Sequence, residues 1–249
     1  MNILVTNDDG FDAPGIRFLA EAAEGLGEIF VVAPDKNHSG ASSSLTLTKE
    51  IAVRRAADGR YRVFGTPSDC IHLALTCDFL PVRPDLIVSG INNGANMGDD
   101  TIYSGTVAAA IEGHLFGVPG FAFSMAGKSA RHFAAGAAVA RDFMRRFQRR
   151  QVPGVPLFNI NIPDAPAESP PQTEITRLGR RHPAQKSVSR PSAANGDLIF
   201  VIGDAGDAQD DAPGTDFHAV LNGAVSVTPL MIDLTDAAQI APVREWLKS

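Results

Sequence analysis

The stretch "ILVTNDDGFDAPG", residues 3–15, sets apolar and β-branched residues directly before two adjacent carboxylates. Consecutive apolar positions are typical of a strand that is covered on both faces, and we expect this strand to span 2–6. Asp8 and Asp9 come where the strand ends, and a proline then opens a helix expected over 14–26. A buried strand that leads at once into a helix predicts the first unit of a doubly wound α/β sheet.

The alternation of strands and helices continues to about residue 162. Apolar runs of strand length are separated by segments whose apolar residues have helical spacing. Strands and helices in this order favour a mostly parallel sheet with helices on both faces. We expect further strands at 29–33, 45–56, 61–65, 85–89, 120–125 and 157–162, and helices at 67–77, 104–116 and 130–150.

The chain changes character after residue 162. A proline-rich segment at 163–171 and an acidic, glycine-containing segment at 203–214 interrupt short strand-like pieces. We therefore predict one domain over 1–249, in which 1–162 is the core and 163–249 is an extension of β-hairpins, an arm and a C-terminal helix. Within the extension we expect strands at 174–178, 198–202 and 224–228 and a final helix at 236–248.

Composition limits the possible partners. The formal net charge of -6 argues against a nucleic acid polymer as partner, because phosphate backbones attract basic surfaces. No segment approaches the ~18 uninterrupted apolar residues of a membrane span, and no secretory signal is visible at the N-terminus. The two cysteines, Cys70 and Cys77, are expected to be reduced and buried. These features predict a cytoplasmic protein that binds no membrane.

The acidic pair raises a physical problem at the end of the first strand. Asp8 and Asp9 cannot both point into an apolar core, and two close carboxylates repel each other, so that one would have to bind a proton. A divalent cation such as Mg²⁺ or Mn²⁺ removes this conflict, because it binds carboxylate, amide and hydroxyl oxygens. The alternative is that the two side chains only shape a turn and cap the following helix.

Two later loops also follow expected strands and supply polar groups. The loop "APDKNHSGASSS", residues 33–44, contains Ser39. The segment "GINNGANMGDDTIYSGTVAAAIEG", residues 90–113, offers asparagine amides that can bind a metal or an anion. Its helix begins at Ser104-Gly105-Thr106, where free N–H groups can bind phosphate. Ligands bind beyond the carboxyl ends of the strands in such sheets, so we expect these loops and the acidic pair to face one crevice.

Several of these motifs together resemble the survival protein SurE family of metal-dependent nucleotidases. The matching pieces are "NDDG" with "APGI", "VVAPDKNHSGAS" with "SLTL", "GTPSDC", "SGINNGANMGDDTIYSGTVAAAIEG", "GTDFHAV" and "VSVTPL", which run in order over nearly the whole chain. The resemblance implies a Rossmann-like core, one divalent metal ion per subunit, and homodimers or homotetramers formed by exchange of a C-terminal arm. It implies the metal ligands Asp8, Asp9, Ser39 and Asn92 and the phosphate-contacting residues Asn96, Ser104, Gly105 and Thr106.

We therefore expect metal-assisted hydrolysis of nucleoside monophosphates. The resemblance implies 5′- and 3′-nucleotides and short polyphosphate as substrates. In this hypothesis Asp8 or Asp9 orients the attacking water or accepts its proton, and the N-terminus of the helix at Ser104 stabilises charge on the phosphoryl oxygens.

Two alternatives remain open at this stage. A covalent aspartyl-phosphate phosphatase also begins with acidic residues after its first strand, but it separates its two aspartates. A non-catalytic nucleotide-binding module is suggested by Gly127-Lys128-Ser129, although the glycine that opens a phosphate-binding loop is missing.

Two features of the extension concern partners. The basic loop at 179–190 is expected either to fold over the crevice and contact phosphate or to form an oligomer contact. The apolar stretch at 217–234 needs a surface that keeps it dry, which could be the chain's own core or a neighbouring subunit. The family resemblance implies exchange between subunits, and we therefore expect that surface to belong to another subunit.

Overall fold

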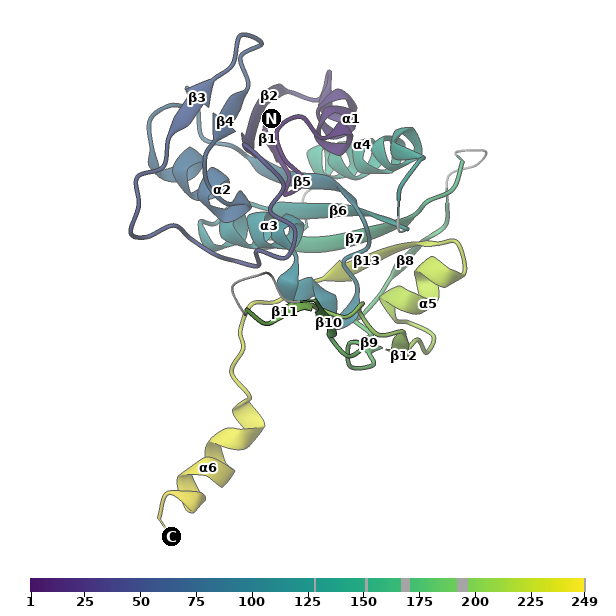
Figure 1. Cartoon of the computed structure of the whole chain (residues 1–249). Helices are drawn as coiled ribbons and strands as arrows, with labels where there is room; N and C mark the ends of the chain where they lie inside the picture. The colour runs from purple at the N-terminus through teal and green to yellow at the C-terminus, as the bar shows by residue number, and fades with distance from the viewer. Residues whose placement is uncertain (128, 151, 167–170, 192–196, 249) are drawn as a thin grey trace.

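The computed structural model describes residues 1–127, 129–150, 152–166, 171–191 and 197–248. Its central element is a mixed β-sheet of nine strands within these residues (Figure 1). In sheet order the strands are β3 (Val53–Arg55), β4 (Tyr61–Val63), β2 (Glu28–Pro34), β1 (Asn2–Thr6), β5 (Leu86–Asn93), β6 (Gly120–Ala126), β7 (Leu157–Pro163), β13 (Val225–Pro229) and β8 (Thr173–Ile175).

Strand direction in this sheet confirms the expected α/β architecture. From β4 through β2, β1, β5 and β6 to β7, each strand pairs in parallel with the next. In contrast, β3 pairs antiparallel with β4, and β13 pairs antiparallel with β7. The chain passes from β1 to β2 on one side and later returns to β5 on the other. The junction of β1 and β5 is therefore a topological switch point, where open α/β sheets bind their ligands.

Four helices cover the two faces of the sheet (Figure 1). On one face, α1 (Pro14–Ala23) and α4 (Phe133–Arg149) pack side by side through residues such as Leu19 and Met144. On the other face lie α2 (Pro67–Thr76) and α3 (Gly105–Leu115), which bury Ile71 and Ala109. Burial on both sides explains the continuous apolar runs of the central strands.

The predicted strand at 45–56 is wrong for its first part. Only Val53–Arg55 forms a strand, because the segment before it is held by a side chain instead of by a neighbouring strand. The buried carboxylate of Asp69 accepts hydrogen bonds from the Thr46 backbone nitrogen at 2.8 Å and the Thr46 hydroxyl at 2.7 Å. The same carboxylate also accepts from the Thr66 backbone nitrogen at 2.8 Å and completes the capping box of α2.

Two smaller expectations also need correction. The final helix is divided into a 3₁₀ turn at Ala237–Gln239 and α6 at Ile240–Trp246. Both cysteines are free, as expected, but only Cys70 is buried, because Cys77 lies just beyond the end of α2 and is exposed. No helix among the described residues is long and apolar enough to cross a bilayer.

Part of the extension returns to the main sheet. Helix α5 (Asp216–Leu221) leads into β13, which lies between β7 and β8. The expectation that 217–234 packs on another subunit is therefore wrong for α5 and β13, which pack on the chain's own sheet. Their apolar residues are covered within the chain, because Phe217 and Val227 are buried.

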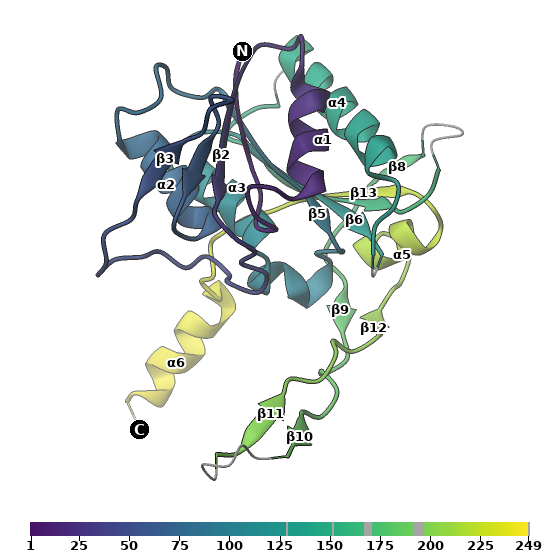
Figure 2. The same cartoon turned by 45° about the horizontal axis from the view of Figure 1, so that its top comes forward.

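Two parts of the extension project from the body instead. One contains the pair β9 (Arg180–Arg181) and β12 (Ala208–Asp210), and beyond it the hairpin β10 (Val188–Arg190) and β11 (Ile199–Val201) (Figure 2). The other is the tail from residue 231 onward, which carries α6 away from the sheet (Figure 1). Below, these are called the hairpin arm (residues 180–210) and the tail (residues 231–248).

Candidate metal and phosphate site

A cavity of about 240 Å³ lies beyond the carboxyl ends of β1 and β5, at the topological switch point. It brings together residues from three separate loops, as the sequence predicted. The described residues that line it are Asp8, Ser39, Gly40, Asn92, Asn93, Ala95, Asn96, Asp100, Tyr103 and Ser104. Five of the eight expected site residues are therefore in one cavity, whereas Asp9, Gly105 and Thr106 lie outside its lining.

Asp8 is buried, with 3% of its surface exposed, and its carboxylate is directed toward the start of α3. The Thr106 hydroxyl donates a short hydrogen bond to Asp8 Oδ1. A Cβ added to Gly105 would lie 2.9 Å from Asp8 Oδ2, so only glycine allows this close approach. Burial, opposed by the Thr106 bond and assisted by the negative charge of Asp9, raises the pKa of Asp8 to about 6. Gly105 and Thr106 therefore position the carboxylate of Asp8.

Asp9 is the more accessible of the two carboxylates. Its Oδ2 accepts a hydrogen bond from the backbone nitrogen of Asn93 at 3.1 Å, which ties the end of β1 to the end of β5. Burial raises the pKa of Asp9 above its ordinary value, and the Asn93 bond opposes the shift.

The turn after β1 is shaped by an asparagine, not by the acidic pair. Asn7 Nδ2 donates to the Gly10 carbonyl at 2.9 Å, and Gly10 has a φ of 109°, which favours glycine. The N-cap of α1 is Ala13, which makes no side-chain capping bond. Neither Asp8 nor Asp9 thus serves as a turn former or helix cap, and the structural alternative for the pair loses its support.

Ser39 and Asn92 reach the cavity from the loops after β2 and β5. The backbone nitrogen of His38 donates to the Asp8 carbonyl at 2.8 Å and brings the first loop against β1. Ser39 is exposed, so its hydroxyl is accessible from solvent. The Asn92 Nδ2 donates to the Gly94 carbonyl at 2.9 Å, which leaves the amide oxygen Oδ1 available for a ligand.

Asn96 is held by a buried polar network that the sequence analysis missed. Its backbone nitrogen donates to Asn161 Oδ1 at 2.8 Å, and its Nδ2 donates to Ser124 Oγ at 2.7 Å. Its carbonyl accepts from Asn159 Nδ2 at 2.7 Å and from Asn161 Nδ2 at 3.1 Å. The signal for these partners is the alternation in "LFNINI", where two asparagines on one face interrupt an apolar strand.

Ser104 combines a cap with a place in the cavity wall. Its hydroxyl accepts from the Val107 backbone nitrogen at 3.1 Å, so Ser104 is the N-cap of α3. Helix α3 begins directly after this wall residue, and the helix dipole adds a partial positive charge at that end. This end of the cavity suits a phosphate group.

The oxygen donors fit a hard divalent cation. No ion pair with a lysine or arginine neutralises Asp8 or Asp9 within the described part of the chain. The same part of the chain holds no group of three His, Cys, Asp or Glu side chains in one place, so a cation here would depend on two carboxylates together with hydroxyl and amide oxygens. That donor set suits Mg²⁺ or Mn²⁺.

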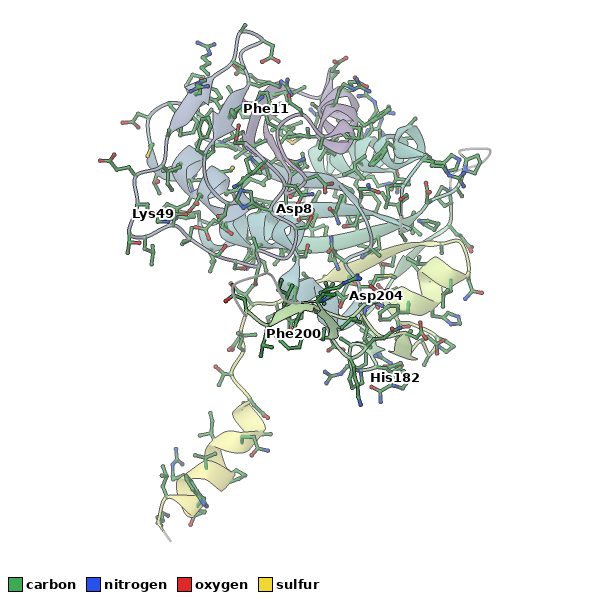
Figure 3. The ribbon with its side chains drawn as sticks, viewed as in Figure 1. Asp8, Phe11, Lys49, His182, Phe200 and Asp204 are labelled. Atoms are coloured by element: carbon green, nitrogen blue, oxygen red, sulfur yellow. The ribbon has the colours of Figure 1, made fainter. Side chains whose placement is uncertain are left out.

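The first basic residues of the 179–190 loop form ion pairs with acidic residues beside the cavity. Arg180 donates to Asp99 at 3.0 Å, and Arg181 forms an ion pair with Asp100, which lines the cavity. Both arginines are thereby bound to acidic side chains in the 3₁₀ helix at Gly98–Tyr103. His182, further along this loop, lies on the hairpin arm away from Asp8 (Figure 3). Lys128 of the phosphate-loop-like sequence lies outside the described residues.

Comparisons with known proteins concern the sequence as a whole and the fold. The model of the family described as survival protein SurE matches residues 3–185. Among solved structures, the crystal structure of the SurE protein from Aquifex aeolicus is similar to this chain, with 37% sequence identity and a TM-score of 0.86. The match covers 100% of this chain and 100% of that chain.

Proposed function

Because the chain belongs to the survival protein SurE family, whose members are generally metal-dependent nucleotidases or phosphatases, we propose that it hydrolyses nucleoside monophosphates to nucleoside and phosphate. One observation carries the proposal. The buried, uncompensated carboxylate of Asp8 and the N-terminus of α3 border the same cavity. Such a site attracts a cation and a phosphate together.

Asp8, Asp9, Ser39 and Asn92 would hold one Mg²⁺ or Mn²⁺ ion, since Asp8, Ser39 and Asn92 line the cavity and Asp9 directly follows Asp8 at the end of β1. When bound, such an ion polarises a phosphoryl oxygen and lowers the pKa of water.

The chain's own groups perform the remaining tasks. Asp9, which is the more accessible carboxylate, orients the attacking water and accepts its proton, while Thr106 keeps Asp8 fixed. Asn96 and the N-terminal end of α3, with its partial positive charge, bind the phosphoryl oxygens and stabilise the charge that develops on them.

The finer assignments are also part of the proposal. We assign 5′- and 3′-nucleotides and short polyphosphate as substrates on the basis of the family resemblance. We assign the cytoplasm as location on the basis of the composition and the two free cysteines. We further propose a homodimer or homotetramer. Support for the oligomer comes from apolar side chains that stay exposed on the tail and the hairpin arm, such as Leu234 and Phe200.

Chelation tests the proposed chemistry. The protein is treated with EDTA, desalted, and assayed with a nucleoside monophosphate before and after Mg²⁺ or Mn²⁺ is restored. We expect turnover to disappear on chelation and to return with the metal. Buffer without protein, treated in the same way, serves as the blank. Full turnover after complete chelation would contradict the proposal. Binding of nucleotide with no turnover under any metal would identify a binding module, and a trapped phospho-aspartate would identify covalent catalysis.

A further inference from the structure

Tyr103 is the one aromatic residue among the described residues that line the cavity. The other lining residues are polar side chains, glycine or alanine. Tyr103 is 65% exposed, and no described aromatic ring or guanidinium stacks on it. A large ring thus stands at the open side of a cavity whose depth is polar.

The backbone that carries Tyr103 is fixed from two directions. Its carbonyl accepts a hydrogen bond from the Ser42 backbone nitrogen at 3.2 Å, and the preceding Ile102 carbonyl accepts from the Ser42 hydroxyl at 2.7 Å. On its other side the chain continues directly into Ser104, the N-cap of α3. These bonds hold the backbone of Tyr103 in place between the loop after β2 and the helix N-terminus.

We propose that Tyr103 is the platform on which the base of the substrate nucleotide stacks. This inference rests on the function proposed above, since it places the base of the same substrate. Tyr103 adjoins the residue that caps the phosphate-binding helix end, with Cα atoms about 3.8 Å apart as in any trans peptide. In a nucleotide, only the ribose separates the phosphate from the base.

Stacking on Tyr103 would bind the base of the substrate, for which the polar part of the cavity offers no aromatic surface. Every nucleobase has a π-face, so an exposed ring binds purines and pyrimidines without reading their edges. Tyr103 therefore makes the site favour nucleotides over phosphate esters that lack a base, while it selects weakly among the bases. The larger π-surface of purines makes them the better substrates.

The test compares two substrates that differ only in the base. Adenosine 5′-monophosphate and ribose 5-phosphate are assayed with the metal-loaded enzyme and with Tyr103→Ala, Tyr103→Phe and Ile102→Ala. Ile102 is the matched control, because it is 69% exposed on the same 3₁₀ helix but does not line the cavity. Binding of adenosine, which carries no phosphate, is measured by calorimetry on the same four proteins.

We expect Tyr103→Ala to lower kcat/KM for the nucleotide roughly 5- to 150-fold, the range of a lost base–aromatic stack. Hydrolysis of ribose 5-phosphate should not change, Tyr103→Phe should behave as the wild type, and adenosine should bind more weakly to Tyr103→Ala alone. An equal loss on both substrates, or no loss, would overturn the inference. If the wild type hydrolyses neither substrate, the proposed function fails, and the adenosine measurement still decides whether Tyr103 stacks on a base.

Discussion

Soluble proteins usually bury apolar side chains and expose polar ones. The strand-end cavity departs from this pattern because it buries polar side chains, and the projecting arms depart from it because they expose apolar ones. Near the cavity, polar side chains such as Asp8, Asn96 and Asn161 are buried. On the hairpin arm and the tail, Leu198 is 81% exposed and Leu234 is 95% exposed. Figure 3 shows the contrast, because Asp8 lies within the body while Phe200 lies on the hairpin arm.

The two regions differ in whether their side chains find partners within the same chain. The buried asparagines near the cavity find partners in the chain's own strands. The carboxylate of Asp8 accepts from the Thr106 hydroxyl, but the effect of burial outweighs its donors and raises its pKa. The remaining negative charge calls for a small cation. The apolar side chains of the arms call for a protein surface instead, since exposed apolar groups are stabilised by burial. The proposed chemistry therefore uses residues of one chain, whereas the exposed apolar side chains support the proposed oligomer.

The largest effect is expected from Asp8→Asn, which removes the buried charge and preserves the shape. Turnover should fall roughly 10²–10⁴-fold, because the carboxylate is lost from the proposed ligand set. In metal-free protein the free energy of unfolding should rise. The pKa of Asp8 lies at about 6 in the folded state against an ordinary 3.8, so ionised Asp8 destabilises the fold increasingly as the pH rises from 3.8 through 6.

The measurement for Asp8→Asn is a set of denaturant titrations of both proteins between pH 4 and pH 7, together with turnover at saturating metal. Asp78→Asn is the matched control, since Asp78 is exposed. Near-normal turnover of Asp8→Asn would remove Asp8 from the site. A stability difference that does not grow with pH would show that the buried charge is compensated.

Truncation of the tail is expected to have an intermediate effect, on assembly more than on the fold. A chain that ends at Leu230 keeps α5 and β13 and loses only residues 231–249, so it should unfold cooperatively and form a smaller assembly than the full chain. A chain that ends at Ala208 loses β13 from inside the sheet, and it should fail to fold. Light scattering gives the assembly, and circular dichroism gives the fold. A full-length protein that stays monomeric at high concentration would contradict the proposed exchange.

The smallest effect is expected from Asp164→Asn. This substitution serves as a reference for Asp8→Asn, because Asp164 is also a carboxylate just after a strand. Burial raises the pKa of Asp164, but the N–H groups of His132 and Arg131 and the His132 ring outweigh it and leave this pKa below its ordinary value. Asp164 thereby stabilises the fold above pH 3.8, and this contribution is lost as the pH falls through its folded pKa. The substitution should lower the free energy of unfolding by about 1 kcal/mol at neutral pH, as the loss of a helix N-terminal acceptor does.

Opposite signs for Asp164→Asn and Asp8→Asn in the same denaturant titrations are the decisive outcome. Both carboxylates lie near the carboxyl ends of strands, but only at Asp164 do the donors outweigh the effect of burial on the pKa. If both substitutions destabilise the metal-free protein equally, the contrast between a satisfied and an unsatisfied carboxylate is wrong.

The sequence by itself determined most helices and central strands of the core and the chemical types at the strand ends. Apolar periodicity identified the helices and central strands, and Pro14 and Ser104 marked where two helices begin. These signals involve residues a few positions apart, so they can be read along the chain. The acidic pair after β1 was visible for the same reason, and the family motifs added which residues to combine with it.

Only the tertiary structure decided how those groups meet. Thr106 bonds to Asp8 across 98 positions, and Asn161 bonds to Asn96 across 65, so each contact depends on the order of strands in the sheet. The strand prediction for the segment before β3 was wrong for a related reason, since the Thr46 backbone nitrogen donates to Asp69, which lies 23 positions away. The position of β13 inside the sheet could not be read from its apolar pattern either, because any apolar surface, in this chain or in a partner, would satisfy that pattern.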